Sequence, residues 1–192
     1  KRNLFANYLG QGWVALMGLV FIPLYIKYLG IEAYGLIGVF AVLTAWLSLL
    51  DIGLTPTLSR EMARFTGGSH TAQSIRDLLR TIELIVLGFA VLIAGGVGFA
   101  SNWIATSWLQ AETLSVKVIA QVITIMGLVI SLRFLETIYR SSIFGLQRQV
   151  LFNIVNSSLA TLRGFGAIGV LAWVSPSIQA FFIWQGLLSI AT

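Results

Sequence analysis

The sequence predicts an all-α protein, a polytopic transmembrane bundle of about six helices. Of its 192 residues, 57% are hydrophobic and only 10% are charged, whereas a soluble domain usually carries about 25% charged residues. The apolar residues form long continuous runs, of the length that crosses a bilayer as a helix. With a mean hydropathy of +0.90, this is more apolar surface than a soluble core of this size could bury.

The first two predicted helices cover residues 4–28 and 33–60. A tight turn is expected between them at Tyr28–Gly35. Pro23 is expected to bend the outer end of the first helix, because proline cannot donate a backbone hydrogen bond. Both segments are long enough to cross the bilayer.

The remaining predicted helices cover residues 75–100, 116–144, 150–174 and 177–192. The loop 101–115 contains two tryptophans and no Lys or Arg, so it is expected to lie at the membrane interface. The chain does not begin with Met, and it stops inside an apolar run. We therefore expect residues 1–192 to be a fragment of a longer protein.

Basic residues indicate the orientation, because cytoplasmic connections carry an excess of Lys and Arg. Eight basic residues fall on one side and two on the other. The first group consists of Lys1, Arg2, Arg60, Arg64, Arg76, Arg80, Arg140 and Arg148, and the second of Lys27 and Lys117. The count predicts a cytoplasmic N-terminus.

Asp51 is a carboxylate inside the second predicted helix. It precedes Arg60 by nine residues, which places it roughly 13 Å deeper at the rise of an α-helix. Gly53 and Pro56 follow at once and are expected to loosen the helix there. An acid at this depth fits proton or cation coupling, a structural pair, or a cap on the helix break near Gly53.

Two further segments carry arginines at depth. Arg133, Glu136 and Arg140 are spaced by three and four residues, so they share one helix face, with Arg133 about two turns below Arg140. Arg163 lies 15 residues beyond Arg148, which is on the order of 22 Å into the membrane. Arg133 either lines a transport pathway or makes a structural ion pair with Glu136 or Asp51.

Polar faces on three helices predict a shared, hydrated, cationic interior. Such a cavity attracts anions, and the planar fork of arginine suits phosphate. The substrate-binding residues predicted on these faces are Arg133, Arg163, Asn153, Asn156, Asn7 and Gln11. Asp51 and Glu136 are the predicted ion-coupling residues. The amides have an alternative role in helix–helix hydrogen bonds.

Several other functions lack the residues they need. There is no cysteine and only one histidine, and we find no phosphate-cradling Gly-Lys-Ser/Thr loop, paired-histidine metal motif or nucleophile–histidine arrangement. We therefore expect no catalytic site, no metal and no cofactor. The basic residues are spread among loops rather than massed on one face, so nucleic acid is not an expected partner.

Two stretches resemble a known family. Residues 28–37, Tyr-Leu-Gly-Ile-Glu-Ala-Tyr-Gly-Leu-Ile, and 50–64, Leu-Asp-Ile-Gly-Leu-Thr-Pro-Thr-Leu-Ser-Arg-Glu-Met-Ala-Arg, resemble the start of polysaccharide-unit flippases. These are the O-antigen translocase group of the MOP exporter superfamily, relatives of MATE transporters. Asp51, Gly53 and Arg60 match the family pattern. The likeness is detailed only over the first two segments, and the roles of Arg133, Glu136 and Arg163 are inferred from depth and facing.

The resemblance implies a twelve-helix fold of two six-helix lobes around a central cavity. Residues 1–192 would then be most of the N-terminal transmembrane lobe, with the second, C-terminal lobe absent from this chain. The resemblance also implies a multi-pass protein of the bacterial inner membrane that flips undecaprenyl-pyrophosphate-linked oligosaccharide to the periplasmic leaflet by alternating access. Implied partners are this lipid-linked oligosaccharide, membrane lipid, a proton or sodium ion, and polysaccharide polymerase and chain-length proteins.

Three other functions stay open at this point. A MATE-type drug/cation antiporter favours an acidic, aromatic cavity, which the deep arginines argue against. A non-transporting membrane scaffold of a polysaccharide assembly complex would not need individually essential buried charges. A membrane-embedded polymerase or ligase would normally have longer periplasmic loops.

Overall fold

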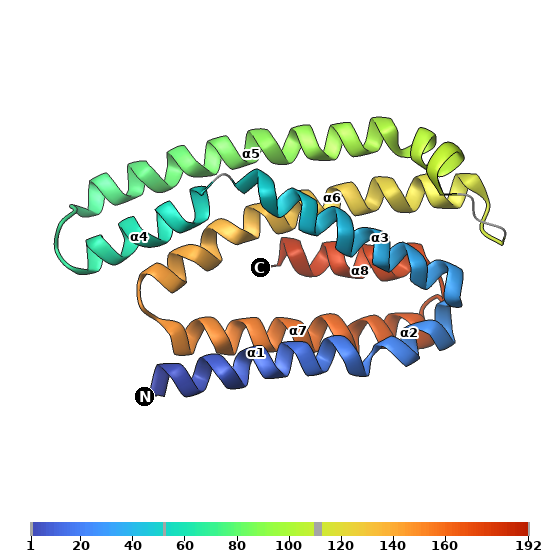
Figure 1. The fold of residues 1–192 in the computed structure, drawn as a ribbon, viewed down its shortest axis with the longest axis horizontal. Helices are drawn as coiled ribbons and strands as arrows, with labels where there is room; N and C mark the ends of the chain where they lie inside the picture. Colours follow the sequence, from blue (N-terminus) through green and yellow to red (C-terminus); the bar gives the residue numbers. More distant parts are fainter. Residues whose placement is uncertain (1, 52, 110–112, 192) are drawn as a thin grey trace.

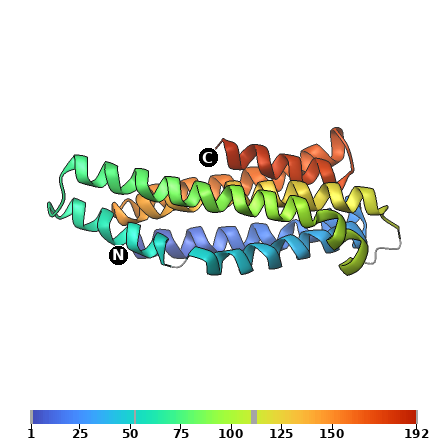
Figure 2. The ribbon, with the colours of Figure 1, turned by 90° about the horizontal axis from the view of Figure 1, so that it is seen from above.

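The computed structural model describes residues 2–51, 53–109 and 113–191, and within these ranges the chain is an all-α bundle. The helices run along one common axis in two views at right angles (Figures 1 and 2). Lys1, which was counted above among the basic residues of one side, lies outside the described residues.

The first predicted segment is confirmed as a bent helix. Helix α1 spans Arg2–Val20 and α2 spans Ile22–Leu29, with the break at Phe21 and Pro23 in the first turn of α2. Proline is tolerated there because the first backbone N–H groups of a helix have no partner within the helix. The predicted turn at Tyr28–Gly35 is wrong in extent, because the connection shrinks to Gly30.

Gly30 has φ +82° and ψ 164°, a backbone region that is essentially restricted to glycine. The next helix, α3, starts one residue later and spans Ile31–Ser48. A single glycine thus replaces a longer loop, and it holds the ends of α2 and α3 close together.

The second predicted segment is broken where the sequence indicated. Helix α3 gives way to a 3₁₀ turn at Leu49–Asp51, and α4 runs over Leu54–Thr66 after Gly53, whose φ is +79°. The predicted end at Arg60 was wrong. Residues 61–66 continue the helix beyond the level expected for the membrane boundary. Passing from the membrane into water does not by itself end a helix.

The third and fourth segments form the longest helices. Helix α5 spans Ala72–Trp103 and continues as a π-helical turn at Ile104–Trp108, and α6 spans Val116–Gly145. Thr71 caps α5 by accepting a hydrogen bond from the backbone N–H of Ser74, as an N-cap hydroxyl commonly does. The predicted loop 101–115 is therefore helical over its first half.

The last two segments agree closely with prediction. Helix α7 spans Gln149–Trp173 and α8 spans Ile178–Ile190. Among the described residues, four helical stretches are long and apolar enough to cross a membrane: residues 7–29, 72–108, 116–145 and 149–173. Helices α3 and α8 are apolar but shorter. The polytopic helical fold is thereby confirmed.

Helix α6 is the centre of the bundle. Val122, Ile123 and Met126 are completely buried on it, and α4, α5 and α8 all pack against it. Helix α1 packs instead along α7. In Figure 1, α5 with α6 and α7 with α1 form two sides, and α3 and α8 lie between them.

The two ends of the bundle differ in charge. One end, called here the basic end, holds the N-terminus, the α4–α5 loop and the α6–α7 turn (left in Figure 1). Its arginines include Arg60, Arg64, Arg76, Arg80 and Arg148. At the opposite end, the Glu32 carboxylate accepts the backbone N–H of Thr113 at 3.0 and 3.2 Å and joins the start of α3 to the α5–α6 connection.

Candidate functional site

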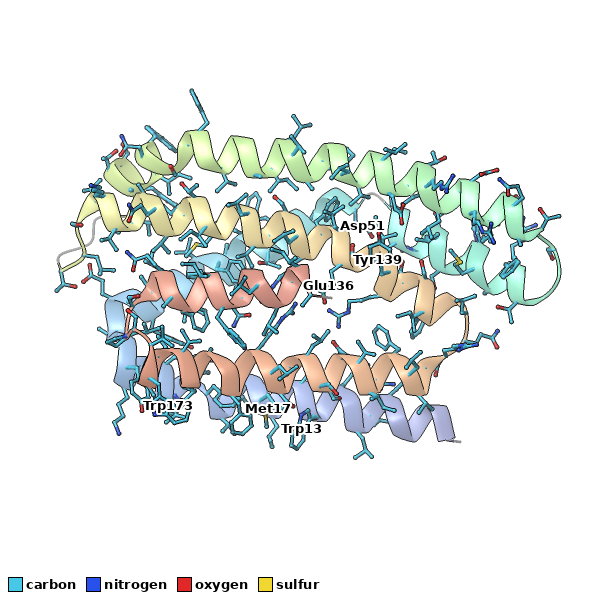
Figure 3. All side chains as sticks on the ribbon, turned by 180° about the vertical axis from the view of Figure 1, so that it is seen from behind. Trp13, Met17, Asp51, Glu136, Tyr139 and Trp173 are labelled. Carbon is cyan, nitrogen blue, oxygen red and sulfur yellow. The ribbon has the colours of Figure 1, made fainter. Side chains whose placement is uncertain are left out.

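Glu136 lies at the centre of a charge cluster inside the bundle. Its side chain is only 4% exposed, on the part of α6 that faces α7 (Figure 3). One carboxylate oxygen pairs with Arg163 of α7 at 2.8 Å and the other with Arg140, one turn along α6, at 3.3 Å. A buried carboxylate needs such partners, because removing a charge from water is costly. Glu136 therefore joins α6 to α7.

Arg133 does not form either ion pair considered from the sequence. Within the described ranges no salt bridge joins it to a carboxylate, since Glu136 is occupied by Arg140 and Arg163. Arg133 instead donates from Nη2 to the side-chain oxygen of Gln185 at 2.8 Å. Its guanidinium carbon lies 4.8 Å from the centre of the Phe40 ring, a cation–π distance.

Two guanidinium groups retain unused donors. The Nε atoms of Arg133 and Arg163 are buried without a hydrogen-bond partner, although buried donors are nearly always paired in folded proteins. Arg163 also donates to the Ser189 hydroxyl at 3.3 Å. Among the described residues, no acceptor is in hydrogen-bond contact with either Nε atom.

The arginines open onto a cavity of about 720 Å³. It is bounded by α1, α2, α3, α6, α7 and α8. Arg133, Arg140 and Arg163 line it, and none of the described residues on its wall is acidic. Among the described residues, Glu136 is the only carboxylate that pairs with these arginines, so the three arginines leave an excess of two positive charges. Low-dielectric walls strengthen the field of such a group and favour an anionic occupant.

Cationic and aromatic side chains share the wall of the cavity. Arg140 and Asn156 are hydrogen-bonded to each other nearest the basic end. Arg133 and Arg163 each lie seven residues further along their helices, which is roughly 10 Å at the helical rise. The aromatic part of the wall is formed by Phe21, Tyr25, Phe40 and Phe181, of which Phe40 contacts the Arg133 guanidinium.

The predicted amide residues divide into two groups. Asn156 lines the cavity, as expected for a substrate-binding residue. Asn153 is buried between α7 and α1, where it donates to Asn7 and to the Gln149 carbonyl. Asn7 in turn donates to the Gln149 side chain at 3.2 Å. These contacts belong to helix packing, the alternative considered from the sequence.

Gln11 is exposed on α1 and does not line the cavity. Contact of Asn7, Gln11 and Asn153 with a substrate stays a prediction. Of the residues predicted to bind substrate, the structure brings together Arg133, Arg163 and Asn156. Arg140, which sequence reasoning left at the membrane boundary, joins them.

Asp51 ends the 3₁₀ turn that precedes α4, and it does not line the cavity. Its carboxylate accepts the Thr55 backbone N–H at 3.0 Å and the Thr55 hydroxyl at 2.7 Å. A carboxylate there also interacts favourably with the positive end of the helix dipole. This geometry corresponds to the capping alternative, and ion coupling by Asp51 stays a prediction.

Two polar residues on α8 that contact the cavity arginines were missed from the sequence; of the two, Gln185 also lines the cavity. Gln185 and Ser189 are buried polar residues four positions apart, so they share one face and contact Arg133 and Arg163 respectively. Their spacing within an apolar helix was the available signal. In the part of the chain that the structure describes, no group of three or more metal-ligating side chains is found.

A comparison with protein families agrees with this picture. The model of a family described as "polysaccharide biosynthesis protein" matches residues 1–191. Neither a curated protein nor a solved structure matches the chain.

Proposed function

Because the chain belongs to the polysaccharide biosynthesis protein family, we propose that it flips undecaprenyl-pyrophosphate-linked oligosaccharide across the bacterial inner membrane. That it is a membrane protein of polysaccharide biosynthesis follows from the family match and the four apolar helical stretches. The identity of the cargo and the flipping step are the proposal.

The observation that carries the proposal is the pair of orphaned guanidinium donors on Arg133 and Arg163 beside an open cavity. An arginine presents five N–H donors in a planar fork, and phosphate oxygens match this geometry. A pyrophosphate would satisfy the buried donors and neutralise the excess positive charge. A cationic drug would meet the same charge as repulsion, which disfavours the antiporter alternative.

The shape of the lobe supports alternating access. Helices α2 and α3 are joined through Gly30 at one end, whereas α1 and α4 pack on different partners, α7 and α6, toward the basic end. We infer that the basic end faces the cytoplasm and that the cavity receives cargo from that side. A second, C-terminal lobe would close the cavity and rock against this one.

Energy coupling and partners complete the proposal. Asp51 and Glu136 are the acidic residues proposed to respond to a proton or sodium ion during the cycle. The role is transport rather than catalysis. The proposed partners are the lipid-linked oligosaccharide, membrane lipid, and polysaccharide polymerase and chain-length proteins.

Transport complementation tests the proposal. The full-length protein carrying Arg133→Ala or Arg163→Ala would be expressed in a strain that lacks its own flippase, with surface polysaccharide and membrane abundance both measured. We expect polysaccharide to disappear while abundance holds for Arg133→Ala, which breaks no ion pair. Arg80→Ala, an exposed arginine near the α4–α5 loop, is the matched control. Normal surface polysaccharide in both cavity variants would refute the proposal.

A further inference from the structure

A second hollow adjoins the cationic cavity and differs from it in chemistry. It encloses about 420 Å³ between α4, α6 and the first turn of α7. Besides Thr137 and Arg140, its wall consists of Thr55, Pro56, Ser59, Ser141, Phe144 and Phe152. Arg140 is therefore the only charged residue among the described ones that form this wall. We call this hollow the apolar groove.

Arg140 also lines the cationic cavity, so the two spaces meet at its side chain. Its guanidinium carbon lies 5.7 Å from the centre of the Phe152 ring. Phe152 packs edge-on against Phe144, with ring centres 5.7 Å apart. One side of this guanidinium thus faces charged and amide groups, and the other faces an aromatic, apolar wall.

The apolar groove continues to the basic end of the bundle. A further hollow of about 560 Å³ shares Pro56, Ser59 and Phe144 with it and reaches Arg60, Gln147 and Gln149 at the rim. Along α6, Phe144 lies one turn from Arg140, or about 6 Å. A path that starts at the polar rim therefore passes first along the apolar groove. It then reaches Arg140, and after that Arg133 and Arg163.

Gly145 helps to form the floor of this path. A Cβ atom at residue 145 would overlap the Ser59 carbonyl oxygen and lie 2.8 Å from Met62 Cβ. The missing side chain lets the backbones of α6 and α4 approach closely, so the groove is a built feature of the α4–α6 contact.

We propose that the apolar groove seats the isoprenoid chain next to the pyrophosphate of the lipid-linked cargo. The inference rests on the function proposed above and assigns a place to the second half of the same molecule. A prenyl pyrophosphate joins a multiply charged head directly to a hydrocarbon chain. The structure offers the same junction, because Arg140 separates the cationic cavity from a wall of Phe144, Phe152 and Pro56. Burial of apolar surface then adds to the affinity that the arginines supply.

Binding of two soluble ligands tests this inference. The full-length protein in nanodiscs would be titrated with inorganic pyrophosphate and with farnesyl pyrophosphate, and the signal of empty nanodiscs subtracted. We expect farnesyl pyrophosphate to bind about tenfold more tightly or better, since isoprene units leave water. In Phe144→Ala this advantage should fall by about threefold or more, whereas the affinity for inorganic pyrophosphate should change by less than about twofold.

The control is Phe99→Ala, which truncates a phenylalanine that is 94% exposed on α5, far from the groove in sequence. It should keep the full chain-length advantage. Equal affinity of the unaltered protein for the two ligands, or an advantage that persists in both Phe144→Ala and Phe152→Ala, overturns the inference and leaves the cationic site intact. If neither ligand binds, both the inference and the proposed function fail.

A photoreactive farnesyl pyrophosphate gives a readout that needs no variant to fold. We expect it to label peptides of residues 54–59 and 141–152 in the unaltered protein, and excess inorganic pyrophosphate should reduce the labelling. Labelling elsewhere overturns the inference. Equal labelling by a photoreactive farnesol would show that the groove accepts any membrane lipid chain, which also overturns it.

Discussion

Arg163 of α7 and Glu136 of α6 are joined by a 2.8 Å ion pair inside the bundle. The carboxylate also pairs with Arg140 at 3.3 Å, so one acid stabilises two arginines from two helices. Near this pair, α7, along which α1 packs, meets α6, against which α4, α5 and α8 pack. The pair therefore has a structural role, whatever part the arginines play with a ligand.

Glu136→Gln should destabilise the protein by removing the carboxylate that pairs with both Arg140 and Arg163. Breaking a buried ion pair on one side leaves its partners uncompensated, at a cost of about 3 kcal/mol. Thermal unfolding of the detergent-solubilised full-length protein, followed by tryptophan fluorescence, measures this. Arg163→Met combined with Glu136→Gln should destabilise less than the sum of the two single changes. Additive effects would show that the two side chains are not coupled.

Gly145→Ala should destabilise the contact between α4 and α6. The added methyl group meets a backbone carbonyl at Ser59 rather than a movable side chain, so overpacking should cost about 2 kcal/mol or more. Gly88→Ala is the control, because a Cβ at residue 88 has open space around it and alanine favours helix. A lowered unfolding temperature is expected only for Gly145→Ala, and equal temperatures for both variants would contradict the packing.

The α4–α5 loop should loosen in acid. Glu61, outside the candidate spans, accepts from or shares a proton with His70 Nε2 at 2.7 Å and pairs with Arg64 at 3.2 Å. The hydrogen bond with His70, followed by the charge of Arg64, lowers the pKa of Glu61 below its usual 4.5. A lowered acid pKa contributes stability above the usual value and loses it as pH falls through the lowered value.

Hydrogen exchange over residues 61–71, corrected for the intrinsic pH dependence of exchange, measures this loosening. Protection should be retained at about pH 6 and lost toward about pH 3. In Glu61→Gln the amides of this segment should exchange quickly at both pH values. Glutamine has no negative charge to pair with Arg64, and its side chain does not titrate. The same acid-dependent loss of protection in Glu61→Gln would assign the effect to another group.

Two variants of Asp51 separate capping from ion coupling. Asparagine can still accept the Thr55 N–H hydrogen bond but has no charge, whereas alanine does neither, and loss of a cap costs about 1 kcal/mol. Asp51→Asn should therefore keep the unfolding temperature, and Asp51→Ala should lower it. If Asp51 couples an ion, Asp51→Asn should abolish polysaccharide export at normal abundance. Normal export by Asp51→Asn would leave capping as its role.

The sequence was sufficient to predict the helices because apolar length and turn residues are local signals. Pro23 and Gly53 marked breaks that the structure contains, and the predicted helix 116–144 differs from α6 by one residue at its end. Helix ends outside the apolar runs were less predictable. At Arg60, the expected membrane boundary does not end the helix, because backbone hydrogen bonds and helix-favouring residues continue to Thr66.

The partners of the charged residues could be predicted only in part. Spacing placed Arg133 and Glu136 on one face, but it could not show that Arg133 turns toward Gln185 while Glu136 turns toward Arg163. Those directions depend on how α7 and α8 are rotated against α6, which no local pattern records. The same rotation puts Asn153 against α1 instead of in the cavity.

Arg133→Lys should reduce export although it conserves charge. Arg133 uses one donor on Gln185, places its planar group over Phe40, and has a buried Nε left for a ligand. A lysine ammonium is a compact point charge that cannot keep this arrangement. Since no described salt bridge depends on Arg133, membrane abundance should hold and export should fall by about tenfold, the effect of losing one charge-assisted hydrogen bond. Export as efficient as in the unaltered protein would mean that charge alone is needed at this position, and the same lysine substitution at exposed Arg80 provides the comparison.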